Sequence, residues 1–131
     1  MPVKYIICED NPSVMTLYKT LFKSKNVSND TVVFFEDGRG AVELIKNLTS
    51  TDIFLLTDFN MPHVNGGEVL KVAIEKEVPY KILRTSMDLE DARKVLLTDY
   101  QINEGVTFIS KQEKLQRLKH EIQEFQENFK D

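Results

Sequence analysis

The chain has a single cysteine, no long apolar run and no surplus of basic residues, and each absence excludes a class of protein. Cys8 is the only cysteine among 131 residues, so no internal disulfide can form. No apolar run approaches the roughly 18 residues that a membrane-spanning helix needs. The chain has 17 Lys and Arg against 21 Asp and Glu, whereas a nucleic-acid backbone or an anionic membrane calls for a basic face. We therefore expect a cytoplasmic protein with no direct nucleic-acid or membrane partner.

The length and the apolar content fit one domain. A chain of 131 residues with 41% hydrophobic residues is long enough to bury a sizeable core. We therefore expect a single domain over residues 1–131. Cys8 lies in an apolar segment of this domain, which predicts a buried and unreactive thiol.

Five short apolar segments alternate with five segments in which apolar residues recur at helical spacing. This order predicts a parallel sheet with helices on both faces, because right-handed crossovers carry each strand to the next. The expected strands are Tyr5–Cys8, Val32–Phe35, Ile53–Leu56, Lys81–Ser86 and Val106–Ile109. The expected helices follow the apolar residues of Val14–Phe22, Ala41–Leu48, Val69–Ile74, Ala92–Leu96 and Leu115–Phe129, and the fourth is expected to end near Leu97 to Tyr100.

Polar and charged residues lie at the ends of four of these strands. Glu9 and Asp10 come directly after the first strand, and Asp58 comes after the third. Thr85 lies at the end of the fourth strand and Lys111 follows the fifth. The carboxyl ends of parallel strands share one edge of the sheet, so we expect these side chains to converge. Clustered carboxylates repel one another unless a cation is bound, and hard oxygen ligands select Mg²⁺, which predicts a magnesium site.

Each of these side chains alone has an ordinary structural explanation. Glu9 and Asp10 suit a capping cluster, and Asp58 suits a solvated loop. A lone lysine is usually a surface residue, and a lone threonine in a strand is usually a β-former. The functional interpretation therefore depends on their joint position at one edge of the sheet.

Arg84 interrupts the fourth apolar segment. A buried strand excludes a guanidinium unless the group is paired or extends to water. We expect Arg84 to reach the end of the sheet.

An ordered set of motifs points to a known family. The motifs are Glu9-Asp10-Asn11-Pro12, Asp58-Phe59-Asn60-Met61-Pro62 with Gly66, Thr85-Ser86, and Lys111. From about Lys4 to the last helix, the chain resembles the receiver domain of bacterial two-component response regulators, including the stand-alone receivers of the chemotaxis type. The resemblance implies an α/β, flavodoxin-like (βα)5 fold, doubly wound, with a five-stranded parallel sheet of order 2-1-3-4-5.

The resemblance also implies roles for individual residues. Asp58 looks like the phosphoacceptor, and Thr85 and Lys111 look like the groups that contact the phosphoryl group. Thr85 and Phe108 resemble the pair that switches on phosphorylation. The implied ligands of Mg²⁺ are Glu9, Asp10, Asp58 and the main-chain carbonyl of Asn60.

The implied partners are proteins. A sensor histidine kinase or a histidine phosphotransfer protein would supply the phosphoryl group, and a downstream protein would read the face beside Thr85 and Phe108. The chain would not be an enzyme acting on other molecules, but a phosphoacceptor that assists its own phosphorylation and dephosphorylation. We expect a monomer or a weak homodimer, the latter through the Leu115–Phe129 stripe, although that stripe first has to cover the sheet.

The residue after Lys111 departs from the family pattern. Members usually have a proline there, commonly with a cis bond, whereas this chain has Gln112. A cis bond before a residue other than proline costs about 2.5–4 kcal/mol, so we expect a trans bond.

Other function classes remain open. An aspartate-based phosphatase would need a second carboxylate at position 60 as general acid, and Asn60 cannot serve. A flavodoxin-like carrier would need a phosphate-cradling loop after the first strand, where Glu9 and Asp10 would repel phosphate. A degenerate receiver that only binds a partner would have lost an acid or the lysine, and none is lost.

Overall fold

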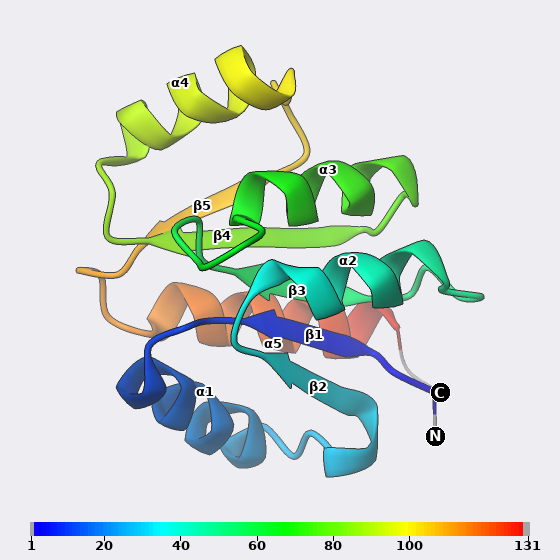
Figure 1. Cartoon of the computed structure of the whole chain (residues 1–131). Coiled ribbons are helices and arrows are strands. Elements are labelled where there is room, and N and C mark those ends of the chain that lie inside the picture. The colour runs from blue at the N-terminus through cyan, green and yellow to red at the C-terminus, as the bar shows by residue number, and fades with distance from the viewer. Residues whose placement is uncertain (1, 130–131) are drawn as a thin grey trace.

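The computed structural model describes residues 2–129, so Met1, Lys130 and Asp131 of the predicted domain lie outside it (Figure 1). Strands and helices alternate along the chain, as the sequence predicts. The strands are β1 (Tyr5–Cys8), β2 (Val32–Phe35), β3 (Phe54–Thr57), β4 (Tyr80–Thr85) and β5 (Thr107–Ser110). The helices are α1 (Pro12–Ser24), α2 (Gly38–Lys46), α3 (Gly66–Glu75), α4 (Leu89–Tyr100) and α5 (Gln116–Asn128), with a short 3₁₀ turn at Asn29–Thr31.

The strands form one parallel sheet in the order β2-β1-β3-β4-β5. This confirms the flavodoxin-like, doubly wound α/β fold. The register pairs Cys8 with both Phe35 and Thr57, and it pairs Thr85 with Ser110. The segments that follow β1, β3 and β5 therefore leave the sheet at the same edge.

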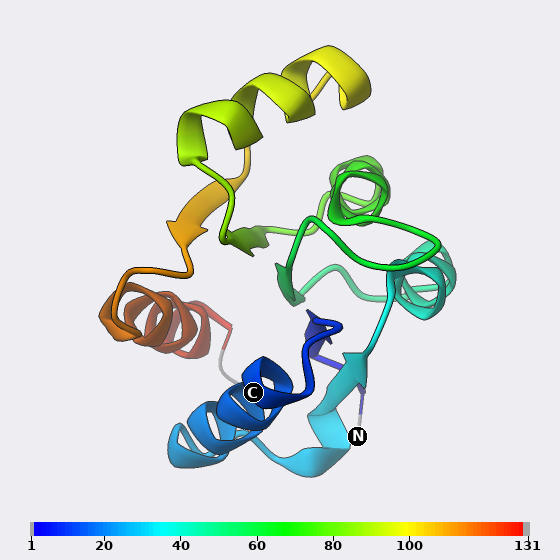
Figure 2. The same ribbon diagram turned by 60° about the vertical axis from the view of Figure 1, so that its left-hand side comes forward.

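Helices cover both faces of the sheet (Figures 1 and 2). Helices α1 and α5 lie on one face, where Tyr18, Phe22 and Phe125 pack on β1 and β3. Helices α2, α3 and α4 lie on the other face, where Val69 and Leu96 belong to the second core cluster. The central strands β1 and β3 are therefore buried on both faces, which explains their nearly continuous apolar sequence, whereas the edge strand β2 is only half-buried.

Three of the five strands are shifted by one residue from the predicted bounds, because pairing sets where a strand begins and ends. Ile53 is buried but precedes β3, since its N–H bonds to Thr51 in a turn. Strand β4 begins at Tyr80 and ends at Thr85, which leaves Ser86 exposed beyond the last pair. Strand β5 begins at Thr107 rather than at the preceding valine. Helix α4 ends at Tyr100, within the expected range.

The structure also shows the cap of α1 and confirms the expected burial of Cys8. Asn11 caps α1 by accepting from the N–H groups of Ser13 and Val14, with Pro12 at the first helical position. Cys8 is fully buried, and burial raises the pKa of its thiol to about 12. No helix in residues 2–129 is long and apolar enough to cross a membrane.

Candidate functional site

The three predicted acids meet at the carboxyl edge of the sheet. Glu9 and Asp10 follow β1, and Asp58 follows β3. One carboxylate oxygen from each lies within 4.8 Å of the others. Glu9 and Asp58 are buried, whereas Asp10 is exposed to solvent. The sequence prediction that these acids converge is confirmed.

Lys111, which follows β5, lies between two of the acids. Its ammonium Nζ lies 2.8 Å from Oε1 of Glu9 and 2.9 Å from Oδ2 of Asp58. The contact with Glu9 is an ion pair that does not meet hydrogen-bond geometry, whereas Lys111 donates a hydrogen bond to Asp58. One lysine thus bridges side chains from the ends of two neighbouring strands.

Main-chain groups fix the remaining oxygens of the two buried acids. Oε2 of Glu9 accepts from the N–H of Asn11 at 3.1 Å, and Oδ1 of Asp58 accepts from the N–H of Phe59 at 2.7 Å. Behind Asp58, the first residue of α3 is Gly66, whose N–H donates to the Phe59 carbonyl. A Cβ atom at Gly66 would lie 2.1 Å from the Asp58 carbonyl oxygen, so the close approach of helix and loop requires glycine.

Burial and pairing perturb the titration of the site. Burial raises the pKa of Glu9, although the ion pair with Lys111 and the hydrogen bond from the Asn11 N–H partly offset this. Burial alone would lower the pKa of Lys111, but its bonds to Glu9 and Asp58 outweigh that effect and raise it. Three acids share one ammonium here, so the cluster keeps an excess of negative charge. The donor set of carboxylate oxygens fits a hard divalent cation such as Mg²⁺.

Thr85 is buried beside Lys111. Its carbonyl accepts from the Lys111 N–H at 2.8 Å, and its hydroxyl accepts from the N–H of Met87 at 3.1 Å. Phe108, one strand away on β5, is 9% exposed, and the guanidinium of Arg93 from α4 stacks 4.3 Å from its ring centre. The structure therefore places the predicted switch residues on adjacent strands, with α4 covering the ring.

Two other expectations concern the loops. Asn60 is exposed in the loop two residues after Asp58, and its carbonyl remains a proposed ligand. The described residues contain no cis peptide bond, which confirms the trans expectation for Lys111 and Gln112.

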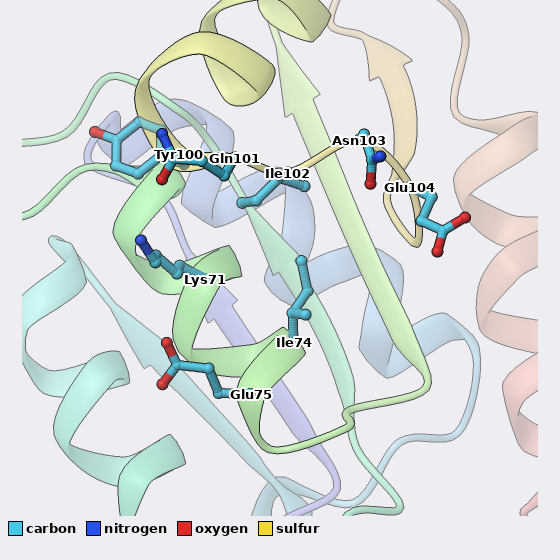
Figure 3. Close-up of a pocket in the computed structure, with 8 residues that line it drawn as sticks. All are labelled: Lys71, Ile74, Glu75, Tyr100, Gln101, Ile102, Asn103 and Glu104. Atoms are coloured by element: carbon cyan, nitrogen blue, oxygen red, sulfur yellow. The ribbon is translucent and has the colours of Figure 1, made fainter.

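A hollow elsewhere on the surface contains none of the predicted site residues (Figure 3). It lies between α3 and the segment that follows α4, and Lys71 and Tyr100 contribute to its wall. Tyr100 donates to Oδ1 of Asn65, the residue that caps α3, and its ring contacts Phe59 edge-on. This contact could not be predicted from the sequence, because no periodicity or motif marks a tyrosine at a helix end.

The partners of Arg84 could not be predicted from the sequence either. The guanidinium lies at the carboxyl edge, as expected, but it is buried and donates to the hydroxyl of Tyr18 on α1. The arginine in an apolar strand was the signal for this contact, but the sequence did not indicate which partner it meets.

Fold and site together define a class: a doubly wound α/β protein with a cluster of acids and a bridging lysine at the carboxyl edge of its parallel sheet. The family model of the response regulator receiver domain matches residues 5–123. The chain belongs to this family.

Solved structures share the fold at low sequence identity. A response regulator receiver protein from Sinorhizobium medicae is 13% identical, with a TM-score of 0.73 over 95% of this chain and 94% of that one. A CheY-like receiver domain from Methanospirillum hungatei is 18% identical, with a TM-score of 0.69 over 98% and 100%. The receiver domain of a Pseudomonas aeruginosa sensor histidine kinase, solved with magnesium in its active-site cleft, is 23% identical, with a TM-score of 0.67 over 95% and 96%. No curated protein sequence matches the chain significantly.

Proposed function

We propose that this chain accepts a phosphoryl group on Asp58 and passes the signal to a partner protein. The observation that carries the proposal is the Lys111 ammonium, held 2.9 Å from Asp58 and 2.8 Å from Glu9 within a cluster of three acids. This arrangement offers a nucleophilic carboxylate next to a cation that can pair with phosphoryl oxygens.

The chemistry follows from these groups. An Asp58 oxygen attacks the phosphorus of the donor, and the bond between phosphorus and the leaving group breaks, so the product is an acyl phosphate. Because both reactants are anionic, the reaction needs positive charge around the phosphoryl oxygens. Lys111 supplies part of it. Bound Mg²⁺ would supply the rest, held by Glu9, Asp10, Asp58 and the Asn60 carbonyl.

The receiver proposal fits the residues better than the alternatives. An aspartate-based phosphatase lacks its general acid, because position 60 is asparagine. A degenerate receiver is disfavoured because all three acids and the lysine are present and meet in space. The proposed donor is a sensor histidine kinase or a histidine phosphotransfer protein, and the proposed setting is the cytoplasm.

The proposed output is a local rearrangement. The Thr85 hydroxyl now accepts a hydrogen bond from the Met87 N–H. If it instead bonded to the phosphoryl group, it would move away from Met87. The space that it leaves would allow Phe108 to move away from Arg93. A downstream protein would then meet a changed surface on α4, β5 and α5. The chain itself would be a monomer or a weak homodimer.

The test is a chemical-shift titration with Mg²⁺ and beryllofluoride, a stable phosphoryl mimic. We expect amide shifts around Asp10 and Asp58 and also within residues 90–120. Asp58→Asn should abolish both sets, whereas Asp52→Asn, which changes an exposed acid before β3, should leave them. Shifts confined to the loops around Asp10 and Asp58 would rule out the switch. An unresponsive wild type would rule out phosphoryl acceptance.

A further inference from the structure

Arg84 is a buried guanidinium at the edge of the site. It is 5% exposed, and in β4 it precedes Thr85. Side chains alternate along a strand, so Arg84 shares a face of the sheet with Ile82. Ile82 and Ile109 of β5 belong to the same apolar cluster under α1 and α5. Packing alone therefore favours apolar residues on this face.

The partners of Arg84 do not neutralise its charge. Nη1 donates to the Tyr18 hydroxyl at 2.9 Å and Nη2 donates to the Lys111 carbonyl at 3.4 Å, while the guanidinium lies 5.5 Å from the Tyr18 ring centre. Within residues 2–129, no carboxylate forms an ion pair with it, and Glu113, whose pKa its charge helps to lower, lies beyond ion-pair distance. Removing a cation from water without a counter-ion costs stability. Stability is therefore a poor explanation for an arginine here.

The two terminal nitrogens of Arg84 bond to two segments that border the acidic site. Lys111 is held through its N–H by the Thr85 carbonyl and through its own carbonyl by Arg84, so consecutive residues of β4 fix both of its peptide groups. Tyr18, the other partner, is buried in α1, the helix that begins two residues after Asp10. Arg84 thus links the turn that carries the lysine to the helix that follows the acids.

We propose that Arg84 is a positioning residue that holds the Lys111 backbone so that its ammonium reaches Asp58 and Glu9. This inference rests on the proposed function, because the lysine matters only if Asp58 takes a phosphoryl group. The lysine side chain is long and flexible, so the place of its ammonium depends on where its backbone is held. Arg84 itself touches no reacting atom and acts through Lys111.

The informative variant is the double substitution Arg84→Met with Tyr18→Phe. It removes the buried donor and the buried hydroxyl together, so neither is left without a partner. The matched control is Lys81→Met, which removes one positive charge from the same strand at its other end. Arg84→Lys serves if the double variant does not fold, because its single nitrogen replaces the two separate donor atoms, Nη1 and Nη2, with which the planar guanidinium reaches its two partners.

The first measurement is the rate of phosphorylation by acetyl phosphate with saturating Mg²⁺, followed by intact mass. We expect the double variant to react about tenfold more slowly than the wild type, because a small displacement of a catalytic group is costly. Its melting temperature should be unchanged or higher, since a buried charge is lost. Lys81→Met should react at the wild-type rate.

The second measurement is the ¹⁵N signal of the Lys111 ammonium in the unphosphorylated protein, assigned with Lys111→Met. A held ammonium gives a distinct signal in the wild type and in Lys81→Met, and we expect that signal to be lost or shifted to the free-lysine position in the double variant. A wild-type rate and an unchanged signal in the double variant would overturn the inference. If the wild type takes no phosphoryl group, the proposed function fails, and the ammonium signal still decides whether Arg84 positions Lys111.

Discussion

Lys111 sets the charge balance among the site residues. Its ammonium pairs with Glu9 and Asp58, and its backbone is bonded to two residues of β4. A lysine at a strand end is ordinary in a sequence, and its two ion pairs appear only in the folded chain. The role of Lys111 is therefore evident from its contacts in the structure and not from its place in the sequence.

Glu9 allows a test of the site through pH. Its pKa is raised from 4.5, chiefly by burial, with the ion pair to Lys111 and the hydrogen bond from the Asn11 N–H opposing the shift. A carboxyl group with a higher pKa in the folded chain binds its proton more tightly there than in the unfolded chain. Its contribution to stability is therefore fully present below pH 4.5, and it is lost as the pH rises through the raised folded pKa.

We predict that Glu9→Gln removes this pH dependence. In metal-free buffer, the free energy of unfolding of the wild type relative to Glu9→Gln should fall as the pH rises from about 4.5. Urea unfolding of both proteins at several pH values measures the difference. Parallel stability curves would mean that folding leaves the titration of Glu9 unchanged.

Individual residues were predictable from the sequence where the backbone alone sets their place. Glu9, Asp58 and Lys111 converge because each follows a strand of one parallel sheet. The contact between Arg84 and Tyr18 was not predictable, since it joins residues 66 positions apart through side-chain orientation. Local periodicity carries no information about such a pair.

The helices and strands were predictable because their signals are local. The Asn11 cap and the proline after it mark the start of α1. The apolar residues at helical spacing in α5 include Leu118, Ile122 and Phe125, which the structure buries. Strand ends were less predictable, because the register with neighbouring strands decides them. Ile53 is a β-former that the register leaves outside β3.

Helix α3 shows how an element fixes the site without contributing a functional side chain. Its cap residue Asn65 accepts from Gly67 and Glu68, and also from the hydroxyl of Tyr100 at the end of α4. A Cβ atom added at Gly67 would lie only 2.3 Å from the nearest ring carbon of Tyr100, so the ring leaves no room for a side chain there. The loop after Asp58 is therefore held between two helices, a restraint that only the tertiary structure reveals.

The molecule as a whole brings its chemistry to one edge of the sheet. Strand order β2-β1-β3-β4-β5 places β1 and β3 side by side at the centre, with their acids adjacent, while β5 lies two strands from β3. A long lysine side chain spans that distance. The fold thus explains why acids come from β1 and β3 and the cation from β5.

We predict that Mg²⁺ stabilises the folded chain, because the unfolded chain lacks the assembled acids. At a concentration ten times its dissociation constant, a ligand that binds only the folded state adds about 1.4 kcal/mol to the free energy of unfolding. Thermal unfolding with and without Mg²⁺ should show a rise of a few degrees in the wild type.

Asp10→Ala should abolish this rise, and it should not lower the melting temperature without metal, because it removes a like charge. Asp52→Ala, at an exposed acid outside the cluster, should respond to Mg²⁺ as the wild type does. A wild type whose melting temperature ignores millimolar Mg²⁺ would show that the metal assignment is wrong.

The most direct measurement is the intact mass of the protein after incubation with acetyl phosphate and Mg²⁺. The wild type and Asp52→Asn should each gain one phosphoryl group, and neither Asp58→Asn nor the wild type in excess chelator should gain any. A wild type that stays unmodified with metal present, or an Asp58→Asn variant that still gains the group, would contradict the assignment of Asp58 as the phosphoacceptor.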